Sequence, residues 1–493
     1  MDFTINIDTN SGVALHHQLY KEIKQAILNG RLKPAQKIPS SRALAQLLGL
    51  SRTTITNCYD ELTSEGYLES ITGSGTFVCQ NLPEKLLQIK KITSNSQNTV
   101  NNSLDINTNL ANFAHRLPNL PKIPRSILQP KFSFRAWSPD LESFPLAEWG
   151  RLLSRYCRTG KKELLGYTSD PLGHKLLRIA IANYLTRARA VSCQASQVII
   201  VSGSQQALDF IARIFIDPAD NVAIEEPGYL GARQAFLSYG ANIYPIEVDK
   251  QGLIVDRLVE SRQQQFKLVY LTPSHQFPTG TVLSLTRRLE LLSWAEKENT
   301  LIIEDDYDSE YRYSGRPIPA LQGLKPNSNV IYVGTFSKVL FPALRIGYLV
   351  VPPSLTNIFS EVKYISDRLS PMIEQYVLAE FINNGSLEKH IRRMRTLYNQ
   401  RRKALVLALE KYFGDKAEII GENAGMHLMV SLKLNLSEQE IIKRANENFI
   451  ELISARDYYL EPKKENEFIF GYATLSEAAI NESIKHLAKI LLS

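Results

Sequence analysis

The sequence predicts a multidomain protein: an N-terminal winged helix-turn-helix domain, a linker, and a larger C-terminal α/β domain whose sheet is mostly parallel. Three observations predict this. Two helical patterns meet at Gly49 and precede short β-type runs, a polar and proline-rich stretch follows, and β-type and helical patterns then alternate. The predicted boundaries are 1–79, 80–131 and 132–493. A length of 493 residues agrees, because single domains are rarely that long.

Composition excludes several classes of protein. The chain is 44% hydrophobic and 22% charged, as globular proteins are, and no apolar run approaches the about 18 residues of a membrane span. The N-terminus lacks the basic start and apolar core of a signal peptide, so we expect a cytoplasmic protein without a membrane partner. The four cysteines lie far apart and predict neither a disulfide framework nor a zinc site.

The N-terminal domain opens with helical patterns. A first helix is expected over residues 14–30, because leucines and isoleucines recur there at helical spacing and Gly30 can end it. A short second helix follows, which Ser40 or Ser41 can cap.

A turn at Gly49 leads into a third helix, which Ser51 can cap and which ends at Gly66. Two helices joined by a tight turn that contains glycine form a helix-turn-helix. Two β-type runs, 67–71 and 76–78, surround a glycine-rich turn and predict a hairpin, the wing.

Charge is polarised within this domain. Residues 21–52 contain seven Lys or Arg and one acidic residue, whereas residues 53–79 contain four acidic residues and no Lys or Arg. With a net charge of +7, this distribution favours double-stranded DNA as a partner. A helical hairpin with a β-ribbon and no role in DNA binding is the alternative. The candidate DNA contacts, at two helix starts and the wing tip, are Arg42, Arg52, Thr53, Thr54, Thr72 and Gly73.

The stretch from residue 80 to residue 131 predicts a linker. It contains a run rich in Asn, Ser and Thr and then four prolines, a composition that forms hydrophobic cores poorly. Its later part can already pack on the second domain.

The most informative stretch of the C-terminal domain is YVGTFSKVLFPALRIGY, residues 332–348. Apolar β-type runs flank Lys338, and a lysine removed from water becomes a nucleophilic amine. The hydroxyls of Thr335 and Ser337 and the guanidinium of Arg345 can neutralise a phosphate beside it. An aldehyde that carries a phosphate describes pyridoxal 5′-phosphate, PLP. A surface lysine between two strands is the simple alternative.

Other polar residues follow predicted strands, where ligands of parallel sheets bind. Ser204 and Gln205 open a helix whose amides can bind phosphate, and Tyr229 offers an aromatic face for stacking. Asp305 follows the strand expected over 300–303 and can pair with a protonated pyridine nitrogen. An acidic surface loop and a hard-cation site are the alternatives, and the neighbouring basic residues argue against a metal.

Two resemblances rest on these motifs. PSSRALA, LGLSRTT, EGYL and GSGTFV resemble the winged helix of GntR-type transcription regulators, and residues 132–493 resemble fold-type I aminotransferases. The second resemblance implies that Lys338 is the Schiff-base lysine, Asp305 the pyridine-nitrogen aspartate and Tyr307 the tyrosine near the phenolic oxygen. It implies that Tyr167 reaches the neighbouring subunit's phosphate. It implies that the ring of Tyr229 stacks on the cofactor. It also implies that the phosphate is bound by Ser204, Gln205, Thr335, Ser337 and Arg345.

The chain departs from typical aminotransferases at two positions. Their Asn-Pro-x-Gly motif, whose Asn bonds the phenolic oxygen, reads HQFPTG here, with Phe277 at the Asn position and His275 or Gln276 as the substitute. The C-terminal strand FIFGYATL lacks the arginine that usually holds a substrate carboxylate. Arg456 or Arg233 is the candidate replacement, and a surface salt bridge is the alternative for each.

The fusion of both parts resembles the MocR family, which includes the GabR and PdxR types. This implies a PLP-dependent transcription regulator that forms head-to-tail dimers and binds DNA. It would sense an amine or amino acid, or PLP itself, through an aldimine at Lys338. One alternative is an active aminotransferase, converting an amino acid to a 2-oxo acid, with an accessory DNA-binding domain. The other is a DNA-binding protein whose large domain only dimerises.

Overall fold

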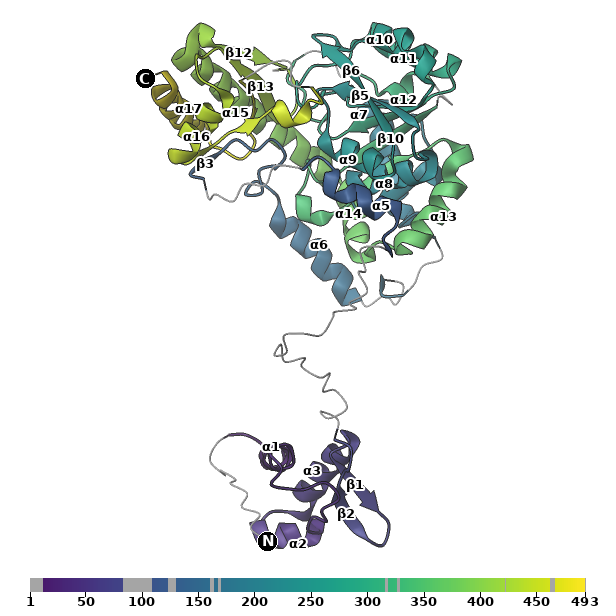
Figure 1. Cartoon of the computed structure of the whole chain (residues 1–493), viewed down its shortest axis with the longest axis vertical. Helices are drawn as coiled ribbons and strands as arrows, with labels where there is room; N and C mark the ends of the chain where they lie inside the picture. The colour runs from purple at the N-terminus through teal and green to yellow at the C-terminus, as the bar shows by residue number, and fades with distance from the viewer. Residues whose placement is uncertain are drawn as a thin grey trace, which may run out of the picture. The chain divides into compact units, whose positions relative to one another are not determined.

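The computed structural model describes residues 12–82, 109–122, 130–159, 164–166, 170–314, 318–325, 329–421, 423–461 and 466–492. By its internal contacts the chain divides into two compact units, Met1–Leu104 and Asp105–Ser493 (Figure 1). Within the described ranges, no helix is both long enough and apolar enough to cross a membrane.

The small unit is a winged helix-turn-helix. Its elements follow in the order α1 (Leu15–Leu28), α2 (Ser41–Leu48), α3 (Arg52–Ser64), β1 (Leu68–Ile71) and β2 (Gly75–Val78), and the two strands pair antiparallel. The sequence predicted each element, and the ends differ by one or two residues. The first helix, for example, is capped by Asn29 rather than by Gly30.

Local chemistry explains these helix boundaries. The Ser40 hydroxyl accepts a hydrogen bond from the Ala43 amide at 3.2 Å, and the Ser51 hydroxyl accepts one from the Thr54 amide at 3.1 Å. Gly49 ends α2 with a φ of 64°, in the left-handed region that glycine adopts without strain. The three helices enclose a core whose central side chains are Leu19, Ile23, Leu44, Ile55, Cys58 and Leu62.

The large unit is built on an eight-stranded sheet. In spatial order its strands are β4 (Val198–Val201), β11 (Gly347–Val350), β10 (Val330–Thr335), β9 (Leu301–Asp306), β8 (Phe266–Leu271), β5 (Asn221–Glu226), β6 (Asn242–Asp249) and β7 (Gly252–Leu253). Strands β10, β9, β8, β5 and β6 are parallel, whereas β7 is antiparallel to β6. Since β11 is antiparallel to both β10 and β4, β4 points in the same direction as β10.

Helices cover both faces of this sheet (Figure 1). One face packs against α8 (Ser204–Phe215), α9 (Leu230–Ser238) and α13 (Thr356–Asp367). The opposite face packs against α7 (Lys175–Arg189), α10 (Val255–Glu260), α11 (Leu285–Lys297), α12 (Leu321–Leu324) and α14 (Met372–Asn383). A sheet buried on both faces explains why its strands are near-continuous apolar runs.

The C-terminal part of the large unit is built around a second, four-stranded sheet. Its antiparallel sheet has the order β12 (Ala417–Ile420), β13 (His427–Leu432), β16 (Glu467–Gly471) and β15 (Ile453–Ser454), and its helices are α15 (Ser386–Phe413), α16 (Glu438–Glu447) and α17 (Glu477–Leu492). Strand β3 (Phe132–Ser133) pairs parallel with β14 (Ile450–Glu451), so the start of this domain is joined to its end. Helix α6 (Leu146–Thr159) packs against α14.

Part of the predicted linker packs on the large unit. Helix α5 (Asn112–Arg116) lies on α9, where the Phe113 ring packs edge-on against Tyr239 at 5.3 Å. The Gln234 amide donates to the Pro121 carbonyl at 2.6 Å. These contacts place the end of the predicted linker in the large unit, ahead of the predicted domain start at residue 132.

Candidate cofactor site and DNA interface

Six strands of the large sheet end at the same edge, and the segments after five of them line the site. Strands β4, β5, β8, β9 and β10 point in one direction, so the residues after their carboxyl ends converge. A cavity of about 360 Å³ lies there. Nine predicted residues line it, namely Ser204, Gln205, Tyr229, Asp305, Tyr307, Thr335, Ser337, Lys338 and Arg345.

Lys338 places its amine in this cavity. The side chain is half-buried, and its Nζ donates a hydrogen bond to the Trp137 carbonyl at 2.7 Å. Burial lowers the pKa of Lys338 to about 8, although the carboxylates of Asp308 and Asp305 act in the opposite direction. The amine therefore loses its proton much closer to neutral pH than an ordinary lysine does.

Asp305 lies within a strand rather than after one. Strand β9 continues to Asp306, beyond the predicted end at residue 303, and successive side chains point to opposite faces. Asp305 therefore faces the cavity, while the Glu304 carboxylate accepts from the Leu321 amide at 2.8 Å.

One oxygen of the Asp305 carboxylate has no partner. Its Oδ2 accepts a hydrogen bond from Tyr270 at 2.8 Å, while Oδ1 is buried without a partner among the described residues. Burial raises the pKa of Asp305 to about 7. A cationic ring nitrogen in the cavity would satisfy this oxygen and stabilise the carboxylate.

The start of α8 and Arg345 form a site for an anion. Gly203 precedes α8 with a φ of 85°, and a Cβ atom there would lie 2.9 Å from the Arg345 guanidinium. Because Gly203 has no side chain, the Arg345 guanidinium can occupy this space, where it donates a hydrogen bond to the Ser202 carbonyl at 2.7 Å. Amides at a helix start, an arginine and the hydroxyls of Thr335 and Ser337 together suit a phosphate.

These features fit PLP. The chain offers an amine with a lowered pKa, a buried carboxylate oxygen that lacks a partner, and an anion site at a helix start. The Tyr229 ring also lines the cavity, where it packs edge-on against Phe277 at 5.9 Å. Phe277 offers no hydrogen-bond donor, so the position of the usual Asn contributes only apolar surface.

Neither suggested substitute for that Asn lines the cavity. The Gln276 amide donates to the carbonyls of Pro227 and Phe277, each at 2.7 Å. His275 is buried and lies behind Tyr307, whose hydroxyl is 2.9 Å from its Nδ1.

The two suggested carboxylate-binding arginines also lie outside the cavity lining. Arg233 is buried and donates to the carbonyls of Tyr458 at 2.6 Å and Tyr459 at 3.3 Å, so it holds that segment in place. Arg456 is exposed at the start of the same short helical turn. Tyr167 lies outside the described residues.

Several lining residues were not predicted. Tyr270 is the penultimate residue of β8, a position that the apolar run KLVYLTP already indicated. Trp137 and Tyr458 come from segments distant in the sequence, and no local pattern marks them. The further unpredicted lining residues are Ala136, Ser138, Leu230, Thr272, Phe277 and Pro342.

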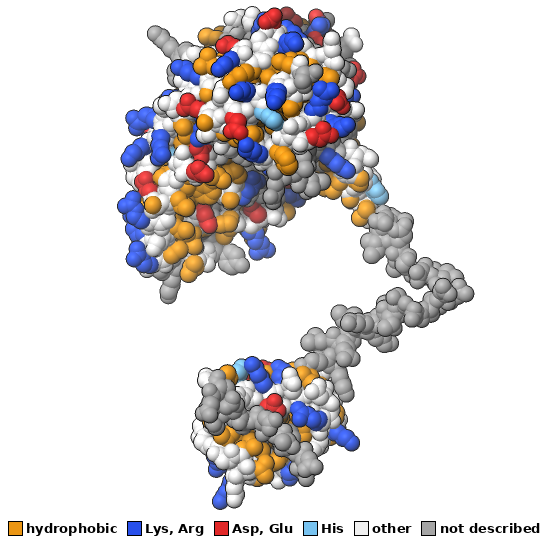
Figure 2. Space-filling view, turned by 90° about the vertical axis from the view of Figure 1, so that its left-hand side faces the viewer, with side chains coloured by type: hydrophobic (Ala, Val, Ile, Leu, Met, Phe, Trp, Pro, Cys, Tyr) orange, Lys and Arg blue, Asp and Glu red, His pale blue; other side chains and the backbone are white. Residues whose placement is uncertain are grey.

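The candidate DNA contacts lie at the surface of the small unit. Arg42, Arg52 and Thr53 are exposed, as are Thr72 and Gly73 at the wing tip. The face of this unit visible in Figure 2 carries more Lys and Arg than Asp and Glu.

One candidate DNA contact, Thr54, and one of the basic residues, Lys24, have side-chain partners within the small unit. The Thr54 hydroxyl lies 2.8 Å from the Ser51 hydroxyl at the start of α3. Lys24 pairs with Glu65 at 2.8 Å, so one of the seven basic residues counted in the sequence supports the packing of α1 on α3.

Comparison with known families separates the same two parts. Residues 15–78 match the family of bacterial regulatory proteins called gntR, and residues 140–487 match aminotransferase class I and II. The chain is 37% identical to a probable rhizopine catabolism regulatory protein, MocR, of Rhizobium meliloti, across 99% of this chain and 96% of that protein. The chain belongs to the MocR family.

Other matches extend this likeness. The MocR-family chain is 27% identical to a pyridoxine biosynthesis transcriptional regulator, PdxR, of Corynebacterium glutamicum, over 97% of this chain and 96% of that one. Its structure matches the Pyrococcus horikoshii kynurenine aminotransferase solved with PMP, with a TM-score of 0.71 and 28% identity, covering 79% of this chain and 98% of that chain.

Proposed function

We propose that this MocR-family chain is a DNA-binding transcription regulator that senses an amine or amino acid, or PLP itself, at Lys338. The observation that carries the proposal is the Lys338 amine in a cavity that also presents Asp305 and Arg345. PLP is the cofactor, because the aminotransferase fold and the residues of this site both fit it.

Each part of the site has a role toward the cofactor. Lys338 would hold the cofactor covalently, and Asp305 would keep its ring nitrogen protonated. When bound, PLP supplies an aldehyde carbon that condenses reversibly with amines. Tyr229 would stack on the ring. The phosphate would be held by Ser204, Gln205, Thr335, Ser337 and Arg345.

An amine effector would compete with Lys338 for the cofactor. Arg456 is the proposed partner for an acidic group of such an effector, since it is exposed two residues before Tyr458, which lines the cavity. Arg233 is the weaker candidate, because its guanidinium already donates to two carbonyls.

Binding of the effector can regulate DNA binding only if the two states of the protein differ in affinity for it. We propose a head-to-tail dimer in the cytoplasm, in which the liganded site changes the spacing of the two winged helices. Double-stranded DNA would be contacted by Arg42, Arg52, Thr53, Thr54, Thr72 and Gly73.

The test replaces Lys338 with alanine. We expect Lys338→Ala to remove the visible absorbance of the lysine-bound cofactor, because no amine remains to hold it. Lys433→Ala serves as the control, since Lys433 is exposed and pairs with Glu418 at 3.1 Å. PLP and amino acids, including 4-aminobutyrate, are then titrated while absorbance and binding to the protein's own promoter region are followed. An unchanged spectrum in Lys338→Ala would refute the assignment.

The alternative function is that of an active aminotransferase. An aromatic-amino-acid aminotransferase of Thermococcus litoralis is 30% identical over 72% of this chain. Phe277 and the winged helix argue for the regulator. Steady turnover of an amino acid with a 2-oxo acid would favour the enzyme.

A further inference from the structure

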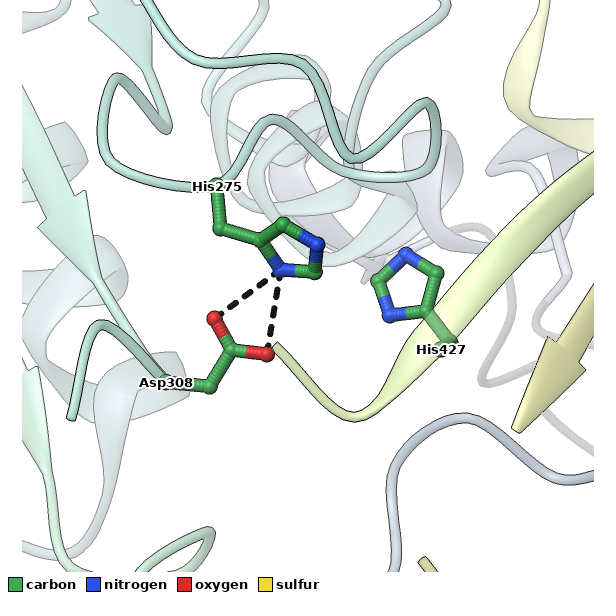
Figure 3. A group of neighbouring side chains, drawn as sticks. All are labelled: His275, Asp308 and His427. Carbon is green, nitrogen blue, oxygen red and sulfur yellow. Dashed lines mark hydrogen bonds and ion pairs between the residues drawn. The ribbon is translucent and has the colours of Figure 1, made fainter. Parts of the chain in front are cut away.

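A buried chain of three polar side chains stands behind the cavity. The Tyr307 hydroxyl lies 2.9 Å from His275 Nδ1, and the same nitrogen lies 3.0 and 3.1 Å from the two carboxylate oxygens of Asp308 (Figure 3). Tyr307 lines the cavity, whereas His275 and Asp308 are only 2% and 1% exposed. The proposed function assigns no role to the last two residues.

The hydrogen-bonding roles follow from the chemistry of the groups. A carboxylate can only accept, so His275 Nδ1 carries the hydrogen that faces Asp308. The Tyr307 oxygen then accepts a bifurcated hydrogen bond from His275 Nδ1, which it shares with Asp308. The hydroxyl hydrogen of Tyr307 is therefore free to be donated to a group in the cavity. Burial raises the pKa of Tyr307 well above its usual range, so the hydroxyl keeps this hydrogen.

His427 completes a tight buried group with His275 and Asp308, which invites comparison with a metal site (Figure 3). His427 Nε2 lies 3.1 Å from the Pro278 carbonyl, so this nitrogen carries a hydrogen. The His275 nitrogen that faces Asp308 is the one already engaged in hydrogen bonds, and its other nitrogen lies across the ring. His275 Nε2 and His427 Nδ1 are buried without a partner among the described residues, whereas His275 Nδ1 is shared between Asp308 and Tyr307. The hydrogen bonds that His275 Nδ1 makes favour a positioning role for His275 over coordination.

We propose that His275 and Asp308 are positioning residues that hold Tyr307 as a hydrogen-bond donor toward the phenolic oxygen of the cofactor. The proposal rests on the proposed function, because it takes PLP as the cofactor. It explains how the site tolerates Phe277, since the buried hydrogen-bonded pair of His275 and Asp308 orients the hydroxyl that remains. His275 thus compensates for the missing Asn indirectly, from behind Tyr307.

The test measures how the visible absorbance of the lysine-bound cofactor changes with pH. A donor to the phenolic oxygen stabilises the phenolate and so weakens its hold on the neighbouring nitrogen's proton. We expect Tyr307→Phe to raise the titration midpoint by about one pH unit, the size of one charge-assisted hydrogen bond. Asp308→Asn, which keeps the shape but removes the charge, should raise it by a smaller amount. These variants keep every other titratable or charged residue that lines the cavity, namely Tyr229, Tyr270, Asp305, Lys338, Arg345 and Tyr458.

A double variant separates positioning from a general structural effect. In the Tyr307→Phe background, Asp308→Asn should no longer raise the midpoint, because that effect passes through the missing hydroxyl. Only the direct electrostatic effect of Asp308 on Lys338 remains, and its loss lowers the midpoint. His427→Asn is the matched control, since its hydrogen bond goes to Pro278, and it should leave the midpoint unchanged. Equal shifts by Asp308→Asn with and without the Tyr307 hydroxyl would overturn the proposal.

Two further outcomes are decisive. One bound metal ion per chain that is lost in His427→Asn would overturn the proposal in favour of coordination. Absence of visible absorbance from the unmodified protein would instead refute the proposed function itself, so the two failures are distinguishable. Thermal melts of each variant confirm that a shifted midpoint comes from a folded protein.

Discussion

At the scale of single residues, the site depends on how burial changes ordinary side chains. Lys338 and Asp305 face one cavity, yet burial shifts their pKa values toward each other, to about 8 and about 7. Burial disfavours the charged form of either group, so it lowers the pKa of a lysine and raises that of an acid. Both side chains therefore change charge within about a unit of neutral pH.

This predicts a pH dependence of cofactor capture. The neutral amine is the reactive form, so the rate at which cofactor-free protein takes up PLP should rise with pH, with a midpoint near 8. Stopped-flow absorbance between pH 6.5 and about 9.5 measures this rate. Asp308→Asn should move the midpoint lower, because Asp308 raises the pKa of Lys338. A midpoint near that of free lysine, about 10.4, would contradict the prediction.

At the scale of elements, serine hydroxyls set the starts of the two helices of the helix-turn-helix. Ser40 caps α2 and Ser51 caps α3 with similar geometry, at 3.2 and 3.1 Å. Only the second cap lies beside the predicted base-reading residues Arg52 and Thr53. Removing either cap should therefore cost the small unit the same stability, but only the loss of the Ser51 cap should disturb the predicted base-reading residues.

We expect Ser51→Ala and Ser40→Ala each to lower the free energy of unfolding of the small unit by about 1 kcal/mol, because each removes one cap. Ser51→Ala should weaken operator binding more, since it loosens the start of α3. Ser51→Thr keeps the hydroxyl and should restore both properties. Urea unfolding and gel-shift titrations provide the measurements. Equal losses of DNA affinity in the two alanine variants would show that α3 has no special role.

At the scale of the whole molecule, two units carry separate cores. The core around Leu19 and Ile55 belongs to the small unit, and the cavity residues all belong to the large one. A ligand that binds one unit should therefore stabilise that unit alone, unless the two units unfold together.

Unfolding by urea should show two transitions. All three tryptophans, Trp137, Trp149 and Trp294, lie in the large unit, so tryptophan fluorescence follows that unit while far-UV circular dichroism follows both. PLP at 100 times its dissociation constant should stabilise the fluorescence transition by about 2.7 kcal/mol and leave the other unchanged. Operator DNA should do the reverse. A single transition that both ligands shift would show that the units unfold together.

The sequence by itself determined the elements and most of the site. Capping serines, glycine turns and apolar periodicity are local signals, and they predicted the winged helix to within two residues. The stretch around Lys338, polar residues near the ends of parallel strands and the resemblance to aminotransferases together predicted nine of the residues that line the cavity, because the direction of such strands brings their ends together. The resemblance to the MocR family, first drawn from short motifs, is confirmed by the relatives.

Only the tertiary structure decided which polar side chains reach the cavity. Arg233 lies four residues after Tyr229, the N-cap of α9, yet its guanidinium donates to the Tyr458 carbonyl, which no local pattern reveals. His275 stands behind Tyr307 because two loops distant in the sequence pack together. Hydrogen-bond partners depend on packing between distant segments, and local sequence encodes only backbone preference and the pattern of burial.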